Sequence, residues 1–168
     1  KSDRSSSVRG AVADVEEVRK LFYRLPETAQ ELQTIARTLG APKESVFLRE
    51  EATEKKVKSM DLNNARIIAF ATHGLISGEM KGLAEPALVL TPPKVGSLED
   101  DGLLTASEIA QLKLDADLVI LSACNTASSD GKPGAEGLSG LARSFFYAGA
   151  RSLLVSHWPV ESKSAMKL

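Results

Sequence analysis

A cysteine and a histidine each end an apolar segment of the type that forms a buried strand. Cys124, the single cysteine among 168 residues, closes the run Asp-Leu-Val-Ile-Leu-Ser-Ala-Cys that begins at Asp117, and His73 closes the apolar run 66–72. Neighbouring strands of a parallel sheet deliver their carboxyl ends to one edge, where such folds bind ligands. A nearby imidazole lowers the pKa of a thiol from about 8.5 and favours the thiolate nucleophile. The pattern predicts a hydrolase with a cysteine nucleophile, most simply a protease.

Gly74, directly after His73, adds a second chemical feature to this edge. A residue without a Cβ lets the backbone approach a substrate closely, and its N–H can point at a developing oxyanion. The N–H of Cys124 is the natural second donor. We therefore predict His73 and Cys124 as catalytic residues, with Gly74 and Cys124 forming the oxyanion hole. A lone cysteine at a strand end is usually a small buried hydrophobe, so the prediction depends on the pairing with His73.

Composition restricts the alternatives. Hydrophobic residues make up 43% and charged residues 26%, values typical of a globular domain with a core of its own. A formal charge of -1 argues against nucleic-acid binding, and no apolar run is long enough for a membrane helix. One cysteine cannot form an intrachain disulfide. The predicted chemistry needs no metal and no cofactor. The start at Lys1 suggests a piece of a longer chain, truncated at both ends, and the compartment stays open, with the cytoplasm as the default.

Apolar strands alternate with amphipathic helices along the chain. The predicted strands are 46–48, 66–71, 87–90, 117–122 and 152–156. The predicted helices are an amphipathic one following a flexible Ser5–Ser7 lead-in, one from Pro26 to Gly40, one capped by Thr53, one from the Thr105–Glu108 capping box to Leu112, and one through Phe145 that Gly149 ends. This order indicates an α/β fold with a mostly parallel central sheet and helices on both faces.

Several motifs together resemble the CHAT family, caspase-like domains found with tetratricopeptide repeats in bacteria. The resemblance rests on Phe70-Ala-Thr-His-Gly74, Leu118-Val-Ile-Leu-Ser-Ala-Cys-Asn-Thr126, Glu136-Gly-Leu138, Leu141-Ala-Arg-Ser-Phe145, Ala148-Gly-Ala150 and Trp158-Pro-Val160, and upstream on Leu25-Pro26 with Glu31 and on Glu51-Ala-Thr53. It covers roughly residues 25–165. The spacing of His73 and Cys124 also agrees with the roughly 50 residues between histidine and cysteine in caspases.

The resemblance implies a caspase/separase-type, three-layer sandwich, and we expect residues 1–168 to form a single CHAT domain. Within it, the residue pattern predicts a flexible lead-in plus an amphipathic helix over residues 1–24. It implies a cysteine endopeptidase that cleaves a protein or peptide substrate through a thioester acyl-enzyme. His73 corresponds to the general base, Cys124 to the nucleophile and Gly74 to the oxyanion donor. Tetratricopeptide repeats are expected elsewhere in the full protein.

Two other functions compete with this prediction. A catalytically silent caspase-like scaffold, which binds partners within a repeat-containing regulatory protein, remains the alternative, because activity requires geometry and activation as well as the right residues. A nucleotide-binding α/β domain is disfavoured because no Gly-rich phosphate loop follows a strand.

Several side chains remain open as further site residues. His157 also follows a strand, although it lacks the glycine that follows His73, and Trp158 beside it could line a substrate pocket. Candidates for a carboxylate that selects the substrate side chain are Asp130, Glu136 and the run 99–101. Glu136 has the simpler role of a charge at a helix N-terminus, and a charge run is usually a solvated loop. Substrate preference therefore stays undetermined.

Overall fold

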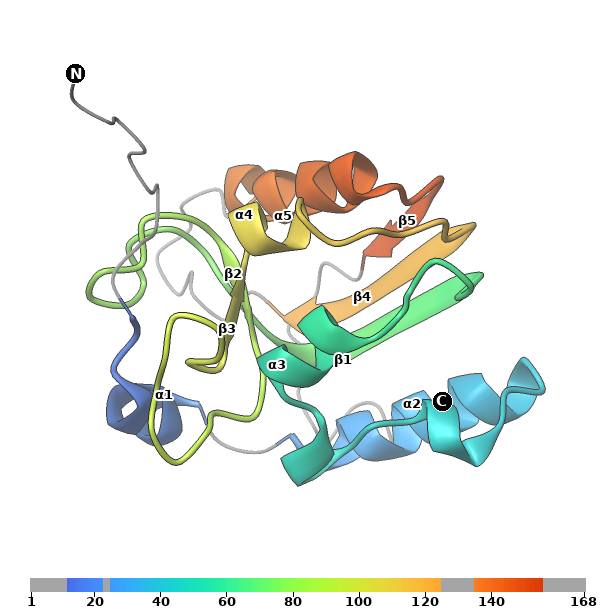
Figure 1. Cartoon of the computed structure of the whole chain (residues 1–168), viewed down its shortest axis with the longest axis horizontal. Helices are drawn as coiled ribbons and strands as arrows, with labels where there is room; N and C mark the ends of the chain where they lie inside the picture. The colour runs from blue at the N-terminus through green and yellow to red at the C-terminus, as the bar shows by residue number, and fades with distance from the viewer. Residues whose placement is uncertain (1–11, 23–24, 125–134, 156–168) are drawn as a thin grey trace, which may run out of the picture.

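A five-stranded sheet with helices on both sides forms the structure, a computed structural model that describes residues 12–22, 25–124 and 135–155 (Figure 1). The strands are β1 (Ile67–Leu75), β2 (Ala87–Val89), β3 (Leu103–Thr105), β4 (Leu118–Cys124) and β5 (Leu153–Val155), in the order β3-β2-β1-β4-β5. The helices are α1 (Val15–Leu21), α2 (Pro26–Thr38), α3 (Glu54–Ser59), α4 (Ala106–Ile109) and α5 (Ala135–Ala148), with 3-10 turns at Lys43–Ser45 and Arg49–Glu51. The predicted α/β class is confirmed.

The sheet is mixed, with its parallel part at the centre. β1 pairs with β4 and β4 with β5, both in parallel, as the apolar runs predicted. β2 and β3 add two antiparallel pairings beside β1. The prediction included the strand at 87–90 but no strand at 103–105, so it missed the antiparallel β2–β3 hairpin.

Helices lie on both faces of the sheet (Figure 1). One face packs against α4 and α5, where Val119, Leu121 and Phe145 are at most 1% exposed and the rings of Phe70 and Phe145 lie 5.6 Å apart. α2 lies along the opposite side of the sheet in Figure 1. Because successive strand residues alternate between faces, burying Val119 and Leu121 on the α5 side assigns Ile120 and Ser122 to the other face.

Helix signals in the sequence were accurate, and one strand prediction was wrong. The Thr53 hydroxyl accepts the Lys56 N–H at the start of α3, and Thr105 and Glu108 form the predicted capping box of α4. α4 itself ends at Ile109, short of the predicted Leu112. Residues 46–48 form no strand, because they connect two 3-10 turns and no neighbouring strand pairs with them.

Gly149 ends α5 where a larger residue would not fit. Its φ of +112° disfavours any side chain, and a Cβ would lie 2.1 Å from the Leu114 carbonyl oxygen. We expect Gly149→Ala to lower the free energy of unfolding by about 3 kcal/mol, because a strained φ and a backbone clash add together. Gly40→Ala is the matched control: its φ is +67° but nothing lies within 4 Å of its Cβ, so it should cost about 1 kcal/mol. Urea unfolding of both variants measures the difference, and equal losses would contradict the clash.

Candidate functional site

His73 and Cys124 occupy matched positions of neighbouring parallel strands. The register of β1 and β4 runs from Ile67 opposite Leu118 to His73 opposite Cys124, without interruption. Cys124 is the last residue of β4, and His73 lies two residues before the end of β1. Matched positions of a parallel pair lie on the same face of the sheet. The predicted meeting of these two residues at the carboxyl edge is therefore present in the backbone.

The His73 side chain is buried and lies against an aromatic ring. It is 7% exposed, and burial along β1 becomes complete only at His73, Gly74 and Leu75. The Phe22 ring, just beyond α1, lies 5.6 Å from the imidazole, measured between ring centres, with the planes tilted by 50°. Gly74 pairs with Leu88 of β2. The residues of β1 at the carboxyl edge of the sheet are thus packed within the fold.

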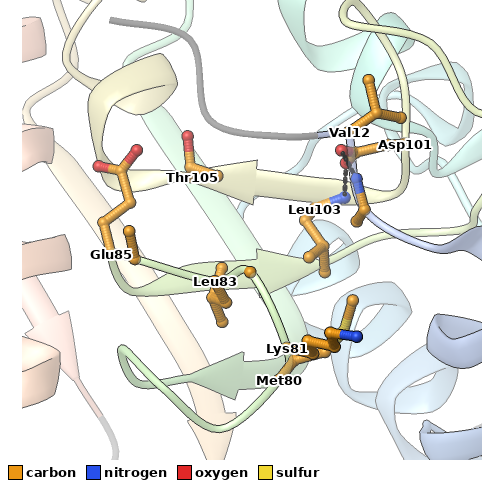
Figure 2. Close-up of a pocket in the computed structure, with 11 residues that line it drawn as sticks. Val12, Met80, Lys81, Leu83, Glu85, Asp101, Leu103 and Thr105 are labelled. Atoms are coloured by element: carbon orange, nitrogen blue, oxygen red, sulfur yellow. Dashed lines mark hydrogen bonds between the residues drawn. The ribbon is translucent and has the colours of Figure 1, made fainter.

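A small cavity lies between the N-terminal segment, β3 and the loop after β1 (Figure 2). Its volume is about 80 Å³, and it is lined by Val12, Ala13, Met80, Lys81, Gly82, Leu83, Ala84, Glu85, Asp101, Leu103 and Thr105. Ligand pockets usually measure about 300–1,000 Å³, so this space is too small for a substrate segment. His73 does not line it, and we assign it no role in substrate binding.

The acidic run 99–101, a candidate for substrate selection, is used within the fold. Asp101 accepts the N–H of Ala13 at 2.7 Å and that of Leu103 at 3.0 Å, the contacts drawn as dashed lines in Figure 2. Asp100 is 8% exposed, and burial raises the pKa of its carboxyl. Of these three residues, Glu99 alone is solvent-exposed, as expected for a solvated loop of charged residues. The carboxylate of Asp101 therefore holds the N-terminal segment against β3.

A buried carboxylate that the sequence analysis did not single out organises the same loop. Glu54 is 1% exposed, and its Oε2 accepts the N–H groups of Asp101 and Gly102 at 2.8 and 3.1 Å. The Lys58 amine lies 2.6 Å from Glu54 Oε1 and 2.8 Å from Glu108 Oε1. The spacing of Glu54 and Lys58 was a visible signal for an ion pair on one helix face, but their burial under the loop depends on the tertiary fold.

The comparison with known families agrees with these motifs. The sequence profile described as "CHAT domain" matches residues 2–168. The chain belongs to the CHAT domain family. Its five-stranded α/β sheet is consistent with the caspase-like fold expected of such a domain, as the sequence analysis predicted.

Two curated relatives carry the name tetratricopeptide repeat protein 28, one from mouse and one from human. Each is 30% identical to the CHAT domain over 176 residues. The alignment covers 84% of this chain but 7% of each relative. The predicted association of the family with tetratricopeptide repeats is confirmed, whereas the two animal relatives give no support to a bacterial source. No solved structure matches the chain.

The opposite end of the CHAT sheet carries exposed ion pairs. Asp117, which precedes β4, forms ion pairs with Arg66 before β1 and with Arg151 before β5. A hydrogen bond from Arg66 is the main reason that the pKa of Asp117 is lowered, and Arg151 acts in the same direction. These solvent-exposed pairs tie together the amino ends of three strands. Asp117 thus lies far from Cys124 along β4, as expected.

Three other candidates, Asp130, His157 and Trp158, lie outside the described residues, and of Glu136 only its place in the first turn of α5 is described. In the described part of the CHAT domain, no group of three or more His, Cys, Asp or Glu residues is arranged to hold a metal ion. No helix among those residues is both long and apolar enough to cross a membrane.

Proposed function

We propose that this CHAT domain is a cysteine endopeptidase in which Cys124 is the nucleophile and His73 the general base. One observation carries the proposal: His73 and Cys124 pair directly at the carboxyl ends of β1 and β4. Nucleophilic catalysis requires a thiol and a base within reach of each other, and neighbouring register positions at one sheet edge support that pairing. Membership of a family with a caspase-like fold supports the same chemistry.

In the proposed reaction, His73 takes the thiol proton and Cys124 Sγ attacks the carbonyl carbon of the scissile peptide bond. The resulting oxyanion accepts hydrogen bonds from the N–H groups of Gly74 and Cys124, which compensate its charge. The C–N bond then breaks, and the imidazolium returns its proton to the leaving amine, which leaves a thioester on Cys124. A water molecule, deprotonated by His73, hydrolyses the thioester and releases the new carboxyl terminus.

A cleavage profile on a diverse peptide pool tests the proposal and reads the residue preference at the cleaved bond. We expect the wild-type chain to cleave a restricted set of peptides and the Cys124→Ala variant to cleave them at least about 10³-fold more slowly. Cleavage by Cys124→Ala at the wild-type rate would show that Cys124 is not the nucleophile. Labelling by a peptide carrying an electrophilic warhead gives a second readout, and it should disappear in the same variant.

The scaffold alternative is tested by the same experiment. Both relatives are named as tetratricopeptide repeat proteins, and the matched region is a small part of each. We propose that residues 1–168 likewise form one domain of a longer protein, in which such repeats recruit the protein substrate. A folded wild-type chain that neither cleaves peptides nor reacts with the warhead would favour a silent scaffold that presents partners to those repeats.

A further inference from the structure

The short helix α1 carries an aromatic ring to the proposed general base. Its first turn is capped by Asp14, whose carboxylate accepts the N–H groups of Glu16 and Glu17. Val15 and Val18 are buried at 8% and 1% exposure, and Val18 joins a core cluster that includes Leu75, two residues after His73. Phe22 follows directly as the C-terminal cap of this helix. The helix therefore delivers Phe22 to the carboxyl end of β1.

The position of α1 is fixed at several points. The N–H of Ala13 binds Asp101 of the loop before β3, and the Arg19 side chain binds the Pro93 carbonyl oxygen. A Cβ on Gly96 would come within 2.7 Å of Val15 Cγ2, so the loop and the helix are in close contact. At the other end of α1, the Phe22 N–H binds the Val18 carbonyl oxygen at 3.1 Å. These contacts thus fix the Phe22 backbone, which places the Phe22 ring against His73.

The ring contact itself has the geometry that aromatic pairs prefer. A centroid distance of 5.6 Å and a tilt of 50° fall within the range of favourable edge-to-face and offset arrangements. Because His73 is only 7% exposed, its imidazole has little room to turn without displacing the Phe22 ring. An imidazole that must face a thiol on the next strand depends on such a restriction, since small errors of placement lower catalytic rates strongly.

We propose that Phe22 is a positioning residue that fixes the orientation of the His73 imidazole toward Cys124. The proposal rests on the proposed function, because it assigns the contact to the same Cys–His pair. Phe22 does not touch the substrate in this scheme. It acts through His73, so its removal should affect thiol activation and leave substrate binding unchanged.

Three substitutions at Phe22 separate ring contact from packing volume. Phe22→Tyr keeps the ring, Phe22→Leu keeps apolar bulk, and Phe22→Ala removes both. Lys20→Ala is the matched control, because Lys20 is an exposed residue of the same helix. The rate at which iodoacetamide alkylates Cys124, the single cysteine, reports thiol activation independently of peptide cleavage. NMR of the two histidine side chains, with His73→Gln for assignment, reports the imidazole directly.

We expect alkylation to slow about tenfold in Phe22→Ala and about threefold in Phe22→Leu, with Phe22→Tyr and Lys20→Ala within twofold of wild type. The His73 ring protons should shift in the Ala and Leu variants and stay in place in the Tyr variant. Where peptides are cleaved, kcat should fall with KM unchanged. Unchanged alkylation in folded Phe22→Ala would overturn the positioning role even if the His73 resonances move, because loss of the Phe22 ring current alone shifts them. Alkylation of His73→Gln at the wild-type rate would instead overturn the proposed dyad, so the two failures are distinguishable.

Discussion

A double variant carrying Cys124→Ala and His73→Gln should cleave peptides no more slowly than either single variant. Each single substitution is expected to lower kcat/KM by about 10³-fold or more, because residues that act as one catalytic unit lose nearly all their effect when one of them is removed. The pairing of the two residues at one register position of β1 and β4 is the reason for expecting a unit. Single-turnover cleavage of a peptide from the active set measures all three variants against wild type.

The second histidine of the chain, His157, provides the control for this comparison of single and double variants. His157→Gln removes the one other imidazole of the chain and should leave kcat/KM within about twofold of wild type. Losses from Cys124→Ala and His73→Gln that multiply in the double variant would mean that the two residues act independently. A severe loss in His157→Gln with His73→Gln unaffected would move the role of general base to His157.

The sequence was sufficient to predict the centre of the fold because its two long strands are apolar on both faces. Burial of β1 and β4 between helices leaves a continuous hydrophobic run, which is readable without knowledge of the tertiary structure. The register was not readable in the same way. Here the strand register can be predicted from function, because a catalytic pair requires His73 and Cys124 to lie at neighbouring strand ends. Placing them opposite each other aligns the two strands from Ile67 and Leu118 onward.

Shorter elements could not be predicted because tertiary contacts decide them. β2 and β3 have three residues each, and Leu88 and Leu104 are fully buried as a pair across the hairpin. Residues 46–48 are good strand formers, but no strand in the described part of the chain pairs with them, and Arg49 after them takes a positive φ of 53°. The Phe22–His73 contact joins residues 51 positions apart in the chain, and apolar periodicity in α1 gives no sign of which ring Phe22 meets.

Replacing Glu54 with glutamine should remove a pH dependence of folding stability between about pH 5 and 8. Burial is the largest influence on the Glu54 carboxyl and raises its pKa from 4.5 to about 7, although the hydrogen bonds from Lys58 and the Asp101 N–H oppose the change. A raised folded-state pKa gives a contribution to stability that is complete below pH 4.5 and is lost as the pH rises through about 7. The shift corresponds to a loss of about 3 kcal/mol across that window.

Two neighbouring charged groups, Glu108 and Lys58, lose their contributions to stability outside this pH window. Burial alone would raise the pKa of Glu108, but hydrogen bonds from Lys58 and Thr105 together outweigh burial and lower it, so its contribution is lost only as the pH falls below the window. Burial alone would lower the pKa of Lys58, but its hydrogen bonds and charge pairs with Glu108 and Glu54 together raise it above 10.5, so its contribution is lost only at higher pH. Asp100, whose pKa burial raises, changes in the same direction as Glu54 from a lower starting value of 3.8. The difference between wild type and Glu54→Gln therefore isolates Glu54.

Urea unfolding of wild type and Glu54→Gln at pH 5, 6, 7 and 8 measures this difference. Wild type should lose stability relative to the variant as the pH rises, while the exposed control Glu44→Gln should follow wild type at every pH. Glutamine keeps the volume and can accept the N–H groups of Asp101 and Gly102, so the loop before β3 keeps its support. Parallel curves for wild type and Glu54→Gln would mean that Lys58 and the two backbone donors outweigh burial and keep Glu54 ionised throughout. In that case the loop that anchors Ala13 would be held by a permanent charge.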